Sequence, residues 1–284
     1  MSDTWADWLR TRRTGGDPEY ERRMLEHLGT VRDRVLDNAG LASGETLLDV
    51  GCGNGLIAFG ALERGASVVF ADVSRALLDD CRELASAAGV THRCLFVEAA
   101  ATELDEVGDG SIDVVTTRSV LIYVKDKDRA FAEFHRVLRS GGRMSLFEPI
   151  NSFGMAERRG TWGYDLDGVR DLMEKLTDVY AGRQPPDDPM VDFDERDLIS
   201  LAEGAGFFPI HLEYRADIEP PEARNWESFV HSSGNPKIPT LAEAMDEALT
   251  TVERDRLVAA LRPAVEAGRG TWRMGHAYLW AVKQ

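Results

Sequence analysis

Residues 47–74 read LLDVGCGNGLIAFGALERGASVVFADVS, and this stretch decides the fold. A first apolar run ends at Asp49 and a second ends at Asp72, with a glycine-rich turn and a helix-like segment between them. The turn has glycines at alternate positions, namely Gly51, Gly53 and Gly55. Glycines there let the backbone approach a ligand without a Cβ clash, and a carboxylate ending the second strand typically accepts ribose hydroxyls. The stretch therefore predicts a nucleoside-bearing ligand at the carboxyl edge of a parallel sheet.

The glycine spacing narrows the choice of ligand. Dinucleotide-binding turns have the spacing GxGxxG, whereas residues 51–55 have GxGxG and follow the acid Asp49. A carboxylate at that position would repel phosphates and suits a cationic group such as an amine or a sulfonium. The chain has no GxxxxGK(S/T) stretch, so a P-loop is excluded.

Short apolar runs and helical patterns alternate along residues 46–147. The expected strands are 46–50, 67–71, 93–97, 112–116 and 143–147. The expected helices between them are 56–64, 75–88 and 127–138, and the turn 139–142 precedes the fifth strand. This rhythm predicts an α/β fold, with a Rossmann-like, mostly parallel sheet and helices on both faces.

A further helix is expected over residues 18–40, with Asp17 as its N-cap. Its apolar face is expected to comprise Met24, Leu25, Leu28, Val31, Val35 and Leu36.

The rhythm breaks after Pro149, where two long insertions interrupt the α/β pattern. A helix at 195–205 and a strand at 207–214 separate them, helical stretches near 240–250 and 252–266 belong to the second, and 277–282 is expected to be the last strand. Insertions of such length tend to act as caps or lids. The expected division is an N-terminal helical lid at 1–44, a cofactor-binding core at 45–150, a cap insert at 151–190, the continued core at 191–217, a second helical insert at 218–272 and the last core strand at 273–284.

Composition limits the partners of this 284-residue chain. Its net charge of −16 opposes nucleic-acid binding, and the basic cluster 10–13 is expected to be a solvated terminal face. Three cysteines without CxxC spacing argue against a disulfide framework or a zinc site, and no metal is expected. With no secretory apolar region and no run long enough to span a membrane, the chain is expected to be cytoplasmic, as a monomer or homodimer.

Five motifs, in order and spacing, resemble those of the class I S-adenosylmethionine-dependent methyltransferases. They are LLDVGCGNG at 47–55, FADVS at 70–74, FVEAAATEL at 96–104, SIDVVTTRSVLIYV at 111–124 and HRVLRSGGRMSLFEP at 135–149. The resemblance covers about residues 45–150 and is greatest to the small-molecule C-, N- and O-methyltransferases of bacterial biosynthesis. It implies a seven-stranded sheet whose final strand is antiparallel, with S-adenosyl-L-methionine as cofactor and S-adenosyl-L-homocysteine as product.

The same resemblance implies roles for individual residues. Asp49 helps to fix the amino end of the cofactor, Asp72 holds the ribose hydroxyls, and Val73 packs on the adenine. The full set of implied cofactor contacts is Asp49, Gly51, Gly53, Gly55, Asp72, Val73, Ala100, Ala101, Thr102 and Arg118. Two positions depart from the family pattern, because many relatives have an acid where Ala100 stands and a small or amide residue at position 118. An arginine at 118 puts a cation near the cofactor or the acceptor.

Acceptor contacts are expected at the same edge of the sheet. The expected substrate-binding residues are Ile122, Tyr123, Glu148, Trp162 and Tyr164, and the candidate catalytic residues are Glu148, Tyr123 and Arg118. Glu148 either accepts a proton or steadies a developing cation, or it caps a helix or pairs with Arg118.

Residues 151–168 carry aromatic side chains among glycines, which suits either a substrate lid or a hydrophobic plug on the core. The apolar members are Phe153, Met155, Trp162 and Tyr164. Trp5 and Trp8 either join that lid or anchor a dimer contact.

The preferred interpretation is methyl transfer to a small molecule of specialised metabolism, in line and inside an enclosed pocket. One alternative is C-methylation of a prenyl diphosphate, for which arginines would have to converge on the phosphates. The candidates for that are Arg118, Arg158, Arg159, Arg269 and Arg273, with His276 beside the last two.

Another alternative is a protein that binds S-adenosylmethionine without methylating, or that uses it in another reaction such as a cyclisation; the missing acid at Ala100 supports it. A nucleic-acid or protein methyltransferase is disfavoured, because TTRS stands where an NPPY-type tetrapeptide would follow the fourth strand and the net charge is acidic.

Overall fold

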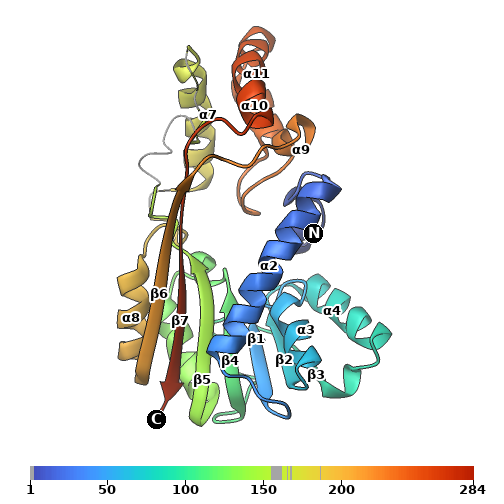
Figure 1. Ribbon diagram of the computed structural model, residues 1–284, viewed down its shortest axis with the longest axis vertical. Coiled ribbons are helices and arrows are strands. Elements are labelled where there is room, and N and C mark those ends of the chain that lie inside the picture. Colours follow the sequence, from blue (N-terminus) through green and yellow to red (C-terminus); the bar gives the residue numbers. More distant parts are fainter. Residues whose placement is uncertain (1–2, 155–161, 165, 167, 186) are drawn as a thin grey trace.

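The computed structural model describes residues 3–154, 162–164, 166, 168–185 and 187–284. This part of the chain forms a seven-stranded sheet with the order β3-β2-β1-β4-β5-β7-β6 (Figure 1). The strands are β1 (Thr46–Val50), β2 (Ser67–Asp72), β3 (Cys94–Glu98), β4 (Ile112–Arg118), β5 (Leu138–Pro149), β6 (Phe207–Glu219) and β7 (Trp272–Lys283). Neighbouring strands from β3 to β5 pair in parallel, and β7 runs antiparallel to both β5 and β6. The expected sheet with an antiparallel final strand is confirmed.

Helices cover both faces of the sheet because its central strands bury side chains on both sides. In β1, Leu47 packs in one layer and the next residue, Leu48, packs in the opposite layer, and both are fully buried. The first layer contains α2 (Pro18–Asn38), α3 (Leu56–Glu63) and α4 (Arg75–Ala87), and the second contains α5 (Lys127–Val137) and α8 (Glu195–Gly204). Burial of apolar surface at roughly 25 cal/mol per Å² is the main driving force for this arrangement.

Four more helices form a separate apolar cluster, which we call the helical cap. They are α7 (Arg170–Arg183), α9 (Trp226–Val230), α10 (Leu241–Ala248) and α11 (Thr251–Glu266). Figure 1 shows the cap beyond one end of the sheet, where the long strands β6 and β7 reach it. Both α10 and α11 begin with a capping box, so their ends are defined locally.

Several boundaries differ from the sequence expectation. The turn expected at 139–142 is part of β5, β6 extends to Glu219, and β7 begins at Trp272. The second insertion is therefore shorter than expected. Much of β6 is exposed without a regular alternation of buried and exposed residues, so its sequence lacks the period-two signal of a half-buried strand.

The start of α2 projects past the sheet toward the cap (Figure 1). Leu25, expected on the apolar face of this helix, is 44% exposed, whereas Leu28 and the apolar residues after it are buried.

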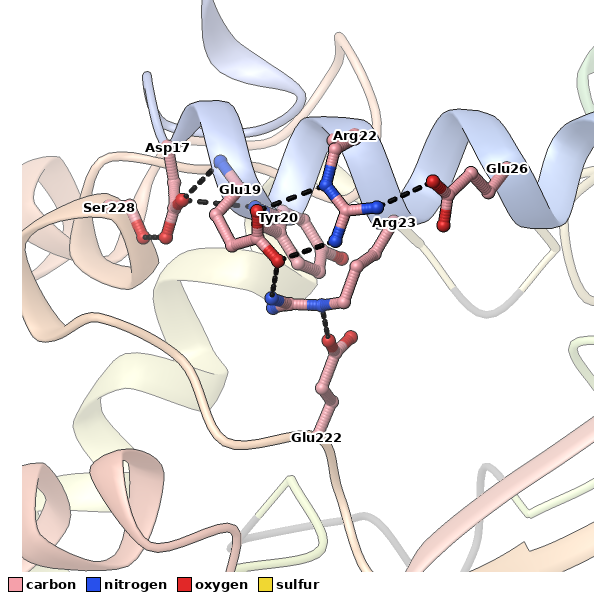
Figure 2. A network of polar contacts seen from close by, with 8 residues as sticks. All are labelled: Asp17, Glu19, Tyr20, Arg22, Arg23, Glu26, Glu222 and Ser228. Carbon is pink, nitrogen blue, oxygen red and sulfur yellow. Dashed lines mark hydrogen bonds and ion pairs between the residues drawn. The ribbon is translucent and has the colours of Figure 1, made fainter.

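Polar contacts tie the start of α2 to the cap region (Figure 2). Asp17 caps the helix by accepting from the N–H of Glu19 at 3.0 Å, and it also accepts from the Ser228 hydroxyl of α9 at 3.4 Å. Arg23 pairs with Glu19 on its own helix and with Glu222 in the loop before α9. These contacts set where α2 meets the cap, and exposed pairs of this kind add little stability by themselves.

Candidate active site

A cavity of about 710 Å³ opens at the carboxyl ends of β1 to β5. One side consists of the glycine turn, the strand ends and the loop after β3. The other side consists of the N-terminal segment, residues 3–13, together with α2 and residues 233–234 of the loop after α9. In parallel sheets this edge is where ligands bind, so the cavity is the candidate active site.

Two glycines of the turn after β1 line the cavity with backbone alone. Gly51 has a φ of +65°, and a Cβ there would lie 2.4 Å from Val120 Cγ2. Gly53 has a φ of +54°, and its N–H donates to Asp72 Oδ2 at 2.8 Å. Glycine adopts this left-handed backbone without the steric cost that other residues meet. Gly55 is the N-cap of α3 and is not among the residues that line the cavity, so its position does not support a direct cofactor contact.

The two strand-end aspartates differ in position. Asp72 lines the cavity and accepts hydrogen bonds from the N–H groups of Gly53 and Ser74, both at 2.8 Å. Asp49 lies beneath the turn, 2% exposed, and accepts from Thr116 Oγ1 and from an N–H of α3. Burial raises the pKa of Asp49 to about 7. Asp72 is therefore placed to receive ribose hydroxyls, whereas Asp49 connects α3 to β4 and does not line the cavity.

The residues expected at the adenine lie together on one apolar side of the cavity. Val73 is 52% exposed although it is a large apolar residue, and it lines the cavity beside Leu77. The loop after β3 contributes Ala100, Ala101 and Thr102. Exposed apolar side chains in a concave site suit contact with a flat ring. Ala100 has no polar side-chain atom. On this side of the cavity, the adenine would therefore hydrogen-bond to backbone groups and to the Thr102 hydroxyl.

Arg118, Ile122 and Tyr123 line the cavity next to the glycine turn. Arg118 ends β4, and the two others belong to the short helix η3 (Leu121–Tyr123). Burial lowers the pKa of Arg118, and the charges of Asp49 and Glu148 partly oppose that shift. Burial also raises the pKa of Tyr123, which packs edge-on against Trp5 with ring centroids 4.7 Å apart.

Glu148 is fully buried and holds η3 in place. Its Oε1 accepts from the N–H groups of Val120 at 2.9 Å and Leu121 at 3.1 Å, and from Thr117 Oγ1 at 3.2 Å. Burial raises the pKa of Glu148 to about 7. Of the roles considered, this geometry matches the helix cap. A direct catalytic contact would require Glu148 to line the cavity, and it does not.

Two aromatic residues expected at the acceptor lie in the cap instead. Trp162 packs edge-on against Tyr180 of α7, and Tyr164 packs edge-on against Phe229 of α9. Both belong to the apolar cluster of the cap, and neither lines the cavity. Their large apolar area is used to bury the cap, so their positions do not support the acceptor contacts expected of them.

The arginines considered for a phosphate do not converge among the described residues. Arg118 lines the cavity, whereas Arg269 and Arg273, near the start of β7, do not. Nearby, His276 packs against the rings of Phe147 and Tyr278. Three further residues considered for the lid or the phosphate, Met155, Arg158 and Arg159, lie outside the described residues.

The N-terminal segment supplies a part of the site that sequence reasoning only partly predicted, because it expected a lid at 1–44 and considered Trp5 and Trp8 for a lid but named no other ligand-facing residue there. It consists of α1 (Thr4–Asp7) and η1 (Trp8–Arg12), followed by Arg13. The residues that line the cavity are Trp5, Trp8, Leu9 and Arg13, joined by Tyr20 and Met24 of α2. The three- and four-residue spacings of Trp5, Trp8 and Leu9, and of Tyr20 and Met24, were the available signal for a face turned to a ligand.

Contacts at both ends hold the N-terminal segment over the cavity. On the core side, Ser74 Oγ donates to Asp3 at 2.6 Å and Arg10 pairs with Asp80. On the cap side, Trp8 Nε1 donates to the backbone oxygen of Ser233 at 2.9 Å. The segment therefore bridges the sheet and the cap across the ligand space.

The basic cluster 10–13 was expected to be a solvated terminal face, but its arginines lie in different environments. Arg10 and Arg12 form exposed ion pairs with Asp80 and Glu243, but Arg13 turns into the cavity. Burial and the positive charge of Arg118 lower the pKa of Arg13 to about 10. A helical segment directs successive side chains to different faces, so a run of arginines does not share one environment.

Two kinds of feature are absent from the described residues. No group of three or more His, Cys, Asp or Glu side chains is arranged to hold a metal ion. No helix in this part of the chain is long and apolar enough to cross a membrane.

Comparisons with known proteins agree with this geometry. Residues 48–146 match the family described as "Methyltransferase domain". A ubiquinone biosynthesis O-methyltransferase of Pseudomonas paraeruginosa is 33% identical over 132 residues, which are 46% of this chain and 55% of that protein. The chain thus spans about half the length of the curated relatives it matches.

Solved structures show the same fold at low identity. A geranyl diphosphate methyltransferase in complex with SAM has a TM-score of 0.54 and 17% identity, covering 95% of this chain and 94% of its own. The [4+2]-cyclase SpnF has a TM-score of 0.53 and 21% identity, covering 90% of this chain and 81% of its own. Likeness at this level concerns the fold alone.

The sheet order, the glycine turn and the strand-end carboxylate define a Rossmann-like, nucleoside-binding α/β domain. More specifically, residues 48–146 form a class I S-adenosylmethionine-dependent methyltransferase domain, whose cofactor is S-adenosylmethionine. The structure fits that cofactor, because the turn leaves no room for a Cβ at Gly51, Asp72 faces the cavity, and Val73 presents an exposed apolar surface.

Proposed function

We propose that this protein transfers a methyl group from S-adenosylmethionine to a small-molecule acceptor, in the context of biosynthetic or specialised metabolism. One observation carries the proposal: a single cavity joins the glycine turn and Asp72 to a second compartment lined by aromatic residues and covered by the N-terminal segment. The O-methyltransferase relative, named for ubiquinone biosynthesis, supports a small-molecule acceptor.

The residues at the cofactor end have separable roles in this proposal. Asp72 receives the ribose hydroxyls, Val73 and Ala101 contact the adenine, and the backbone at Gly51 and Gly53 lies against the methionine part. Asp49 does not touch the ligand, and its buried carboxylate acts at short range on positive charge near the turn.

When bound, the cofactor supplies a methyl group made electrophilic by its positively charged sulfur. A bond forms between the acceptor atom and the methyl carbon, the carbon–sulfur bond breaks, and its electron pair remains on sulfur. The chain's contribution is to align the acceptor and to exclude water. Trp5, Trp8 and Leu9 cover the cavity for this purpose. Glu148 positions η3, which presents Ile122 and Tyr123 to the acceptor.

Calorimetric titration with S-adenosylmethionine and S-adenosylhomocysteine tests the cofactor half of the proposal. In Asp72→Asn we expect both ligands to bind at least about tenfold more weakly, because a charged acceptor of hydrogen bonds is lost. Asp79→Asn, on the exposed side of α4, is the matched control and should bind as the unmodified chain does. Undiminished binding to Asp72→Asn would contradict the ribose role.

Turnover separates methyl transfer from binding alone. Candidate acceptors are incubated with labelled S-adenosylmethionine, and S-adenosylhomocysteine and methylated product are measured together. Stoichiometric formation of both supports the proposal. Tight cofactor binding with conversion of an acceptor but without loss of the methyl group would favour the alternative in which the cofactor is retained for another reaction.

A further inference from the structure

Two arginines face the cavity without a carboxylate partner among the described residues. Arg13 follows the π-turn η1, and its guanidinium carbon lies 5.7 Å from the centre of the Trp8 ring. Arg118 ends β4 and makes a 3.5 Å hydrogen bond to Ser119 Oγ. The charge of Arg118 contributes to the lowered pKa of Arg13, so the two guanidinium groups lie within electrostatic range of each other. Both guanidinium groups therefore line the same cavity.

The surrounding chain makes this absence of partners informative. The protein has 49 acidic and 33 basic side chains, and its other N-terminal arginines are paired. Arg10 pairs with Asp80 of α4, and Arg12 pairs with Glu243 of α10. Even partial burial of a guanidinium without an ion-pair partner is unfavourable, so two such arginines at one cavity indicate a place for an anionic ligand.

The acidic groups that line the cavity are already engaged. Asp72 accepts two backbone N–H groups, and Asp126 accepts the N–H of Arg129 at the start of α5. Neither forms an ion pair with Arg13 or Arg118 within the described part of the chain. No carboxylate of the described residues therefore forms an ion pair with either arginine, and the buried Asp49 and Glu148 act on Arg118 only at longer range.

The cofactor does not neutralise both arginines either. S-adenosylmethionine carries one carboxylate, one ammonium and one sulfonium, so it enters the cavity as a net cation. Its carboxylate pairs with one guanidinium, whereas its ammonium and sulfonium groups add to the excess of positive charge in the cavity. A second anion is required for the other arginine, and the acceptor is the component that remains to supply it.

The rest of the acceptor compartment is apolar and aromatic. Its lining includes Trp5, Trp8, Met24, Tyr123 and Met190. Such walls contribute by contact area and exclude water, which strengthens an ion pair formed beside them. A suitable ligand therefore combines an apolar body with an anionic head.

We infer that the acceptor is an amphiphilic anion whose carboxylate or phosphate is bound by Arg13, beside Arg118 and the cofactor carboxylate, and whose apolar body lies against the tryptophans of the N-terminal segment. This inference rests on the proposed function and specifies the substrate class of the same site. Arg13 is then a specificity-determining residue. Its planar guanidinium binds a carboxylate or a phosphate through two parallel hydrogen bonds.

The test uses the full chain saturated with S-adenosylhomocysteine. Benzoate, phenyl phosphate and the neutral benzamide are titrated separately and their dissociation constants are measured by ligand-observed NMR. We expect at least one of the two anions to bind at least about tenfold more tightly than benzamide, as charge-assisted hydrogen bonds require. The comparison of benzoate with phenyl phosphate distinguishes a carboxylate from a phosphate head.

Three variants locate the effect. Arg13→Gln should remove the preference for the anion, Arg13→Lys should restore part of it, and Arg12→Gln, the neighbouring exposed arginine, should leave it unchanged. Equal binding of benzamide and both anions, or of no probe at all, would overturn the inference. So would an anion preference that persists in Arg13→Gln.

Binding of S-adenosylhomocysteine to every variant is the folding control and also distinguishes the two proposals. If the cofactor product binds and anion preference is absent, the anionic acceptor is rejected and the methyltransferase proposal stands. If the cofactor product does not bind the unmodified chain, the proposed function fails and this inference fails with it.

Discussion

The two halves of the cavity are built in different ways. The cofactor half comes mainly from one contiguous stretch, residues 47–74, with the loop after β3 beside it, and backbone geometry at Gly51 and Gly53 shapes its surface. The acceptor half is assembled from the N-terminal segment, α2, η3 and the loop after α9, which are far apart in the sequence. A binding surface made of backbone tolerates few substitutions, whereas one made of side chains from several elements changes easily. This difference explains why the cofactor is easier to identify than the acceptor.

The strongest test of this contrast is Gly51→Ala. The new Cβ would lie 2.4 Å from Val120 and the backbone would keep a φ of +65°, so both a clash and conformational strain are introduced. We expect S-adenosylmethionine to bind more weakly and turnover to fall by about a hundredfold or more, because a displacement of about 1 Å in a site has that effect on the rate. Calorimetry measures the affinity.

Gly89→Ala is the matched control for that experiment. Gly89 has a similar φ of +70°, but nothing lies within 4 Å of the point that a Cβ would occupy, so only the conformational strain is shared. It should lose stability by about 1–2 kcal/mol and keep its cofactor affinity. Equal affinities in the two variants would show that the turn does not shape the cofactor site.

Glu148 links the two halves, and its removal should have the next largest effect. Glu148→Ala leaves the N–H groups of Val120 and Leu121 buried without their acceptor, which we expect to cost about 3 kcal/mol in the free energy of unfolding. Chemical denaturation measures this loss. A fall in turnover without a change in stability would instead indicate a direct catalytic role.

The pH dependence of stability gives an independent test of Glu148. Its pKa is about 7 in the fold against an ordinary 4.5, so the folded state binds the proton more tightly than the unfolded state does. Protonation of Glu148 therefore adds roughly 3 kcal/mol to the free energy of unfolding. This contribution is fully present below pH 4.5 and is lost as the pH rises through about 7. Asp49, with a pKa also near 7, contributes in the same direction.

Glu148→Gln mimics the protonated side chain and retains an oxygen that accepts the same N–H groups. Denaturation between pH 5 and pH 8 should therefore show a flatter stability profile for this variant than for the unmodified chain, with the relative gain at the higher pH. Parallel profiles would mean that Glu148 does not take up a proton on folding.

Sequence reasoning predicted most of the fold but less of the site. Strands such as β1 and helices such as α4 have strong local patterns, and their bounds agree with expectation to within a residue or so. Asp72 and Val73 line the cavity as the motif implied. Glu148 and Asp49 occupy the expected strand ends, but their side chains are directed to backbone N–H and hydroxyl groups beneath the surface.

The acceptor side was harder to predict because its residues have no shared local pattern. Composition suggested that Trp162 and Tyr164 belong to a lid, yet apolar packing places them in the cap core. Arg13 stood in a basic run whose neighbours are exposed, and only the three-dimensional path of η1 separates it from Arg12. Long-range packing decides these positions, and no spacing rule encodes it.

A smaller effect is expected where the two halves touch. Leu9 of the N-terminal segment lies over Gly53, with its Cδ1 3.5 Å from where a Cβ would be. Leu9→Ala should reduce stability by about 1 kcal/mol and weaken S-adenosylmethionine binding a few-fold by opening the site to water. Leu25→Ala, on the exposed side of α2, removes a side chain of the same size and should leave the affinity unchanged.

The smallest expected effect concerns the exposed contact that fastens the N-terminal segment to α4. Arg10 and Asp80 form an ion pair with three hydrogen bonds of 2.6–3.0 Å, but both side chains are well exposed to solvent. Arg10→Gln should therefore speed the release of S-adenosylhomocysteine by only about twofold to threefold at low salt, measured by stopped-flow fluorescence of the nearby tryptophans.

Salt and a second substitution decide whether that effect comes from the ion pair. The difference between Arg10→Gln and the unmodified chain should shrink at high ionic strength, and adding Asp80→Asn to Arg10→Gln should cause no further acceleration. If the two substitutions are additive, the segment is held mainly by its inner contacts, namely Asp3 with Ser74 and Trp8 with Ser233. In that case the N-terminal segment would be held over the acceptor as rigidly as the glycine turn is held at the cofactor. The two halves of the cavity would then differ only in how far apart their residues lie in the sequence.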